Sequence, residues 1–341
     1  MAYNKGSRKR SSFFVKLISK INECRSRFKT NNKNSDVTVV VTPSALILVA
    51  FVLLIISKFV DVTLLNRDNE YMSVIILQMM IFLLPGALWC MLKGEGYVKG
   101  LSITAPKPDT FLLILAASLV MMSGSLFVSM AFVGENSLSN VFSLYDTFTS
   151  KQDGSVSNAL YLVLAYAALP AVCEEFIFRG ILCREYVDKG ALGAIFLSSL
   201  FFAMLHFNVQ NLPVYFFCGC ILALVQYATR SLWGAVITHF LYNLFGVFGQ
   251  PYMATLYKLT KESRLLVIIA GIVFFSSAAL FCAQASKLYR KYLRSGYSSV
   301  HKKQRDGSVA YFSRVFVDVI KDPFTLALVL VYIIAILISW F

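Results

Sequence analysis

The stretch NALYLVLAYAALPAVCEEFIFRG, residues 158–180, decides the fold of this chain. It is apolar over about the 20 residues that a helix needs to cross a bilayer. It nevertheless ends in two adjacent carboxylates, Glu174 and Glu175, followed by Arg179. Ionisable side chains inside a membrane segment are costly and mark functional sites. The sequence therefore predicts a membrane helix that carries chemistry.

The spacing of these charges assigns them different tasks. Glu175 and Arg179 are four residues apart, so they can pair on one face of the helix. Glu174 points about 100° away from its neighbour and is free to act elsewhere. Pro170 lies just before the pair and can kink the helix.

The whole chain shares this apolar character. Of its 341 residues, 57% are hydrophobic and 15% are charged, and the mean hydropathy is +0.67. Soluble domains carry about 25% charged residues, so a cytosolic enzyme and a secreted disulfide scaffold are excluded. Nine segments are long enough, or nearly so, to span a membrane: 45–65, 72–92, 111–133, 158–180, 191–207, 212–229, 231–249, 265–285 and 324–341. We expect an all-α polytopic membrane protein of about eight or nine transmembrane helices around a cytosol-facing polar cavity.

The distribution of cations predicts the orientation. The net charge is +14. With the N-terminus in the cytoplasm, 26 of the 32 Lys and Arg residues fall in cytoplasmic segments. The positive-inside rule selects this arrangement, so we expect a multi-pass protein of a bacterial plasma membrane. The cations then belong to membrane topology, and nucleic acid is not expected as a partner.

This topology divides the chain into four parts. They are a basic cytoplasmic segment at 1–44, a transmembrane core at 45–285, a basic cytoplasmic loop at 286–323 and a C-terminal transmembrane helix at 324–341. Apolar residues at helical spacing, with cations nearby, predict amphipathic helices in 13–28 and 311–321 that lie on anionic lipid headgroups. An ordinary basic tail and linker is the alternative interpretation.

Three further polar residues lie in predicted spans. His206 and His239 are two of the three histidines, and Asn243 follows His239 by four residues on the same helix face. A helical hairpin with its turn near Gly190 would place Glu174 and His206 at about the same depth, because each is 16 residues from that glycine. We expect these polar groups to meet in one pocket that is reached from the cytoplasm.

These groups suit the hydrolysis of an amide. A carboxylate and a histidine around a water form a general base, as Glu174 and His206 could. A second histidine and an amide, His239 and Asn243, can donate hydrogen bonds to an oxyanion.

A zinc site is the alternative chemistry, with Glu174, His206 and His239 as its ligands. The HExxH pair is absent and Asn243 is a poor zinc ligand. We therefore favour direct activation of water, and the cofactor is left open.

Three motifs together resemble the CAAX protease and bacteriocin-processing (CPBP, or Abi) family of intramembrane endopeptidases. Within 165–249 they are EExxxR at Glu174–Arg179, FxxxH at Phe202–His206 and HxxxN at His239–Asn243. One of these motifs alone is weak, but all three, in this order and on predicted spans, are specific.

The resemblance implies an α-helical membrane fold with a cavity open to the cytosol. It implies a CAAX prenyl endopeptidase-like hydrolase, classed with the metalloendopeptidases, that acts on a peptide or protein substrate, which in some members is lipidated. The four polar residues keep the roles given above, and Glu175 and Arg179 position the helix or bind substrate. The alternative is a non-catalytic membrane scaffold, regulator or transporter on the same fold, because buried carboxylates also occur in ion pathways.

Overall fold

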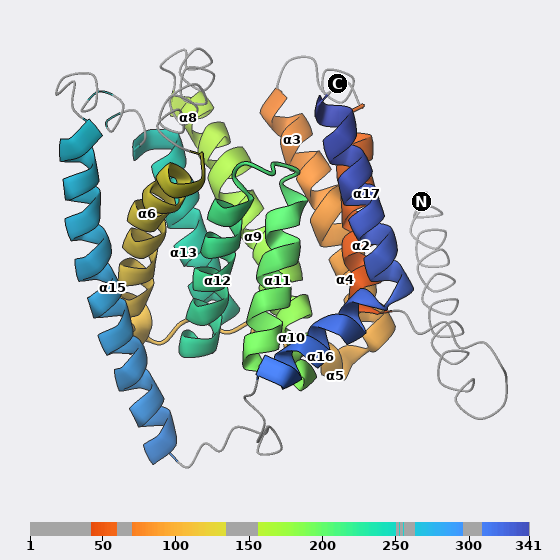
Figure 1. Cartoon of the computed structure of the whole chain (residues 1–341). Coiled ribbons are helices and arrows are strands. Elements are labelled where there is room, and N and C mark those ends of the chain that lie inside the picture. The colour runs from red at the N-terminus through yellow and green to blue at the C-terminus, as the bar shows by residue number, and fades with distance from the viewer. Residues whose placement is uncertain are drawn as a thin grey trace, which may run out of the picture.

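Figure 1 shows a bundle of helices. The computed structural model describes residues 42–59, 70–133, 156–249, 252, 255, 263–295 and 309–340. Within this part of the chain 89% of residues are helical and no β-strand occurs, which confirms the all-α class. The segment 13–28, which we predicted to be amphipathic, lies outside the described residues.

The helices of the first half of the chain follow the predicted apolar segments, except for the short elements α5 and η3, which lie between two of these segments. They are α2 (Pro43–Ser57), α3 (Glu70–Gln78), η2 (Met79–Leu83), α4 (Leu84–Lys93), α5 (Glu95–Val98), η3 (Pro108–Thr110) and α6 (Phe111–Val133). The segment that decides the fold is divided into α8 (Val156–Val163), η4 (Leu164–Ala168), α9 (Leu169–Glu175), η5 (Phe176–Leu182) and α10 (Cys183–Glu185). It runs on beyond residue 180, where we expected the span to end.

The remaining elements complete the bundle. They are η6 (Val187–Lys189), α11 (Ala191–Leu205), α12 (Leu212–Thr229), α13 (Leu232–Leu244), η7 (Phe245–Gly249), α15 (Ser263–Arg294), α16 (Val309–Ile320) and α17 (Pro323–Trp340). In the described part, six helices are long and apolar enough to cross a membrane: Tyr71–Lys93, Pro108–Phe132, Ala159–Glu185, Leu212–Thr229, Leu232–Gly249 and Leu265–Arg294. The other three predicted spans correspond to the shorter apolar helices Pro43–Ser57, Ala191–Leu205 and Pro323–Ile338.

Proline disturbs two of the long helices at points next to the site. Pro170 stands at the start of α9, directly after the π-helical turn η4, and Pro85 stands at the start of α4, directly after the π-helical turn η2. A proline has no N–H for the carbonyl four residues earlier, and its ring crowds that carbonyl. The wider π turn relieves this crowding. The kink that we expected at Pro170 is therefore accompanied by a π-helical turn directly before α9.

The helical hairpin around Gly190 is confirmed. Gly190 has a φ of 86°, a backbone conformation that glycine adopts without steric cost, and α11 begins at the next residue. Helix α11 packs on both η5 and α12. A Cβ atom at Gly219 of α12 would lie 2.9 Å from Cβ of Ser199, so this glycine lets α12 approach α11 closely.

Predicted cytoplasmic segments gather at one end of the bundle. In Figure 1, α5, α16 and the C-terminal end of α15 lie at the bottom of the view. Ion pairs join these segments: Lys93 with Glu185, Lys189 with Asp318, and Lys291 with Asp109. The predicted helix at 311–321 is present as α16.

Candidate active site

The six predicted site residues come from three helices that pack together. Glu174 and Glu175 end α9, and Arg179 follows in η5. His206 is the residue directly after α11, and α13 carries His239 and Asn243. Helix α13 packs on α9, and α11 packs on η5, so the bundle brings all three motifs to one region.

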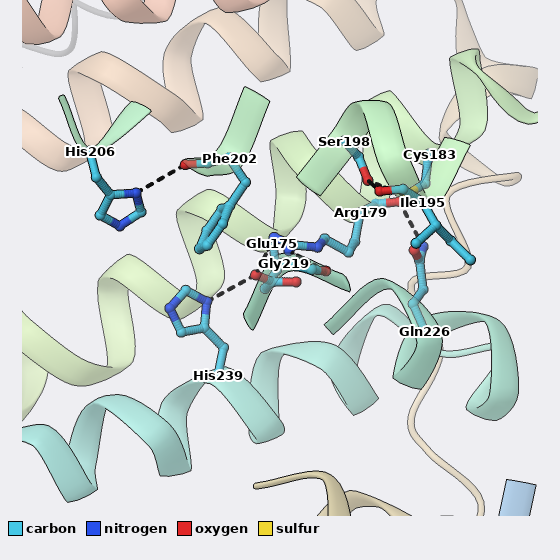
Figure 2. Close-up of polar contacts among 10 residues, drawn as sticks. All are labelled: Glu175, Arg179, Cys183, Ile195, Ser198, Phe202, His206, Gly219, Gln226 and His239. Atoms are coloured by element: carbon cyan, nitrogen blue, oxygen red, sulfur yellow. Dashed lines mark hydrogen bonds and ion pairs between the residues drawn. The ribbon is translucent and has the colours of Figure 1, made fainter. Parts of the chain in front are cut away.

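Glu175 and Arg179 form the ion pair that their spacing predicts. Nη1 of Arg179 donates to Oε1 of Glu175 over 2.8 Å, and both side chains are fully buried. Nη2 of Arg179 donates to the carbonyl of Gly219 over 3.0 Å (Figure 2). The close approach of α12 at this glycine thus places a backbone acceptor beside the guanidinium.

His239 is bound to the same carboxylate. Its Nδ1 lies 2.9 Å from Oε1 of Glu175, and the imidazole is buried (Figure 2). A carboxylate accepts hydrogen bonds, so Nδ1 carries the hydrogen and Nε2 is the nitrogen left for other partners. Spacing alone did not predict this contact, because it paired Glu175 with Arg179 and placed Glu174 with the histidines.

His206 is fixed in the corresponding tautomer by its own helix. Its Nδ1 lies 2.9 Å from the carbonyl oxygen of Phe202. A carbonyl only accepts, so Nδ1 donates, and in the neutral ring Nε2 keeps its lone pair. Nε2 of His206 is therefore able to accept a hydrogen bond.

Phe202 contacts charged and polar residues of all three motifs. Its ring centre lies 4.5 Å from Cζ of Arg179, 5.1 Å from the ring centre of His206 and 5.8 Å from that of His239. The ring thus contacts the guanidinium and both imidazoles (Figure 2). Its face attracts the cation of Arg179. These contacts give a physical reason for a phenylalanine four residues before the histidine.

Glu174 differs from its neighbour in having no direct partner. In the part of the chain that the structure describes, its carboxylate makes no hydrogen bond or ion pair, and it is only partly buried. Glu174 adjoins Glu175 at the end of α9, which packs on the helix that carries His239. His206 lies in the same region, because the Phe202 ring contacts its imidazole, that of His239 and the guanidinium of Arg179. The three motifs therefore meet around Phe202, whereas among the described residues no hydrogen bond or ion pair joins Glu174 to His206.

Asn243 lies one turn beyond His239 on α13 and is partly buried. Its Nδ2 donates to the carbonyl of Ala167 over 3.5 Å, which is long for a hydrogen bond. Ala167 belongs to the π-helical turn that precedes Pro170. The amide therefore faces the helix that carries the two glutamates.

The candidate zinc ligands do not form a metal site in this structure. Among the described residues, no group of three His, Cys, Asp or Glu side chains is arranged to hold a metal ion. Glu174, His206 and His239 are described residues and do not make such a group. We therefore derive no step of the reaction through a metal.

Sequence reasoning missed two residues that shape the site. Tyr215 stacks on His206, with ring centres 3.8 Å apart. Gln226 donates from Nε2 to the carbonyl of Arg179 over 2.7 Å and so binds the π-helical segment to α12. Both residues follow the second motif in an apolar helix. Neither has a spacing to the motif residues that would have revealed its contact.

Comparison with known proteins identifies the segment that contains all of these motifs. Residues 156–245 match the family described as Type II CAAX prenyl endopeptidase Rce1-like. A curated relative from Bacillus subtilis (strain 168), named "Putative membrane peptidase YdiL", is 24% identical over 112 residues, which are 33% of this chain. The match covers 46% of that relative, so the chain spans less than half of its length. No solved structure matches the chain. Residues 156–245, which carry all three motifs, are thus similar to the Rce1-like family of type II CAAX prenyl endopeptidases.

Proposed function

We propose that this protein is an intramembrane endopeptidase of the CAAX type, in which Glu174 and His206 activate the water that cleaves the peptide bond. The observation that carries this proposal is the difference between the two adjacent glutamates. Glu175 is fully buried and bound to Arg179 and His239. Glu174 has no hydrogen-bond partner among the described residues and keeps its carboxylate available for a water.

The proposed first step is general-base catalysis. A water between Glu174 and Nε2 of His206 would attack the carbonyl carbon of the substrate as Glu174 accepts its proton. The proton would then pass to the nitrogen of the departing amine, and the carbon–nitrogen bond would break. The hydrogen bond from Nδ1 of His206 to Phe202 supports this role, because it leaves Nε2 able to accept a hydrogen bond from the water.

The negative charge on the substrate oxygen needs hydrogen-bond donors. Asn243 offers its Nδ2 group, whose contact with Ala167 is long and leaves a second hydrogen free. His239 is the second residue of this proposed oxyanion site, with its Nδ1 held on Glu175 and its Nε2 left for the substrate oxygen. Donors that are already in place where charge develops lower the barrier most.

Glu175 and Arg179 would have a supporting task in this scheme. Their pair is linked to α12 through the carbonyl of Gly219 and to α13 through His239. A site whose residues are held by a second layer of hydrogen bonds keeps its geometry during the reaction. Contact of Glu175 or Arg179 with substrate is not needed for this role.

We propose a peptide or protein substrate, with a lipidated C-terminus as the first candidate, in keeping with the family description. The N-terminus would lie in the cytoplasm of a bacterial cell, and the basic end of the bundle would face anionic headgroups. Helix α16 supports this placement, since it buries Val315 and Val319 while Val317 and Ile320 stay exposed.

The test compares the membrane peptides of cells that carry wild type, Glu174→Ala or Glu185→Gln. Glu185 is a matched control, because it ends the same long helix but pairs with Lys93 away from the site. We expect cleaved peptides to disappear with Glu174→Ala and to persist with Glu185→Gln. Unchanged cleavage by folded, inserted Glu174→Ala would reject the protease and favour a scaffold or transporter.

A further inference from the structure

Tyr215 covers one face of the His206 ring. The two ring centres lie 3.8 Å apart and the ring planes differ by 13°, so the rings are stacked. Tyr215 is in the first turn of α12, whereas His206 follows the end of α11. The contact therefore joins two successive helices across their connection.

The connection between these helices is short and internally bonded. Residues 206–211 link α11 to α12. The backbone N–H of Asn211 donates to Oδ1 of Asn208 over 3.0 Å, and that of Tyr215 donates to the carbonyl of Asn211 over 3.0 Å. These bonds turn the chain back on itself and bring Tyr215 over His206.

Two contacts together determine where Nε2 of His206 points. The hydrogen bond from Nδ1 to the Phe202 carbonyl holds one atom of the ring, but the ring can still swing about that bond. A parallel aromatic face blocks this swing on one side, and the Phe202 ring, whose centre lies 5.1 Å from that of the imidazole, limits it from another direction. We propose that Tyr215 is a positioning residue that orients His206 through its aromatic face.

The hydroxyl of Tyr215 is not what holds the imidazole. In the described residues that hydroxyl makes no hydrogen bond. The proposal therefore concerns the ring alone. It rests on the proposed role of His206 in activating water, but the orientation of the imidazole can be measured without any substrate.

The experiment uses the full chain in lipid bilayers with ¹⁵N-labelled histidine. Only three histidines are present, so His206→Gln identifies the signal of His206. Wild type and Tyr215→Phe should show a single tautomer with Nδ1 protonated, and Tyr215→Leu should show a mixture. Phe216→Leu is the matched control, because Phe216 packs on Phe196 instead of His206 and the variant should keep the wild-type signal.

Turnover measurements complete the test. Misplaced catalytic groups cost about a hundredfold in rate. We expect Tyr215→Leu to lower kcat by about tenfold to a hundredfold at unchanged KM, and Tyr215→Phe to stay within about twofold. A single Nδ1-protonated tautomer in Tyr215→Leu would overturn the proposal, as would equal losses for the Phe and Leu variants. If wild type cleaves nothing, the proposed function fails, and the histidine signals still decide the role of Tyr215.

Discussion

His239 donates its Nδ1–H to Glu175 over 2.9 Å within the helix bundle. The same carboxylate oxygen accepts from Arg179 over 2.8 Å. One oxygen of Glu175 therefore joins the first and third motifs, while Oε2 is buried without a partner among the described residues. This arrangement distinguishes the two adjacent glutamates, because Glu175 binds two side chains while Glu174 makes no hydrogen bond or ion pair among the described residues.

Breaking the pair of Glu175 and Arg179 should destabilise the fold more than replacing both residues. Removal of one partner leaves an uncompensated buried charge, at a cost of about 3–5 kcal/mol. We expect Glu175→Leu and Arg179→Met each to lose about that much unfolding free energy, and the double variant to lose less than either single variant. Unfolding titrations in mixed micelles give the unfolding free energy of wild type, the two single variants and the double variant.

The pair Lys93 and Glu185 is the control for this cycle. It is partly exposed, so neutralising both residues should change stability by about 1 kcal/mol or less. Additive effects of the Glu175 and Arg179 variants would contradict the coupling that the geometry indicates.

Asn243→Ala should impair catalysis without unfolding the protein. Loss of one oxyanion donor lowers kcat by about 10²–10³. The amide makes only a long contact with Ala167, so little stability should be lost with it. The measurement is kcat together with the thermal midpoint in detergent. A wild-type kcat in this variant would remove Asn243 from the oxyanion site.

Gly219→Ala should disturb the site from a distance. The added Cβ would lie 2.9 Å from Cβ and 3.0 Å from Cα of Ser199, so α12 would have to move away from α11. Overpacking of this kind costs about 1–3 kcal/mol. The carbonyl that accepts from Arg179 would move with the helix.

Gly246→Ala is the control for this substitution, because nothing lies within 4 Å of its added Cβ. Thermal unfolding of the two variants should show a lower midpoint for Gly219→Ala alone. Equal thermal midpoints for the two variants would mean that α11 and α12 accommodate the added methyl group without loss of stability.

Ser231→Ala should weaken the start of α13. The Ser231 hydroxyl accepts a hydrogen bond from the N–H of Gly234 and so caps α13. The same hydroxyl donates to the carbonyl of Thr104, which ties the start of α13 to the segment before η3. Loss of an N-cap serine costs about 0.5–2 kcal/mol. Thermal unfolding of Ser231→Ala should show this loss, whereas Ser276→Ala, on an exposed helix surface, should change little. Similar shifts for the two variants would argue against the cap.

Much of the architecture could be predicted because apolar runs and glycine turns have local causes. The hairpin at Gly190 and the pairing of Glu175 with Arg179 follow from chain spacing, and the structure contains both. The count of eight or nine crossings remains a prediction. Helix α11 has 15 residues, about 22 Å, and ends before His206, which makes this histidine a helix-terminal residue.

The partners of the two histidines could not be predicted, because they depend on how separate helices pack. Spacing placed Glu174 with the histidines, whereas packing brings His239 to Glu175. The stack of Tyr215 on His206 depends on how the connection 206–211 folds back. Contacts between elements of this kind have no periodic signature in a single sequence.

The π-helical turn before Pro170 changes the angular register of the helix that follows. A π turn takes one more residue than an α turn, so side chains beyond it are rotated by about 100° from their positions on a regular helical wheel. A second such segment starts at Phe176, directly after the two glutamates. A one-residue deletion between Leu164 and Ala168 would therefore aim Glu174 at a different neighbour, although the composition of the helix would hardly change.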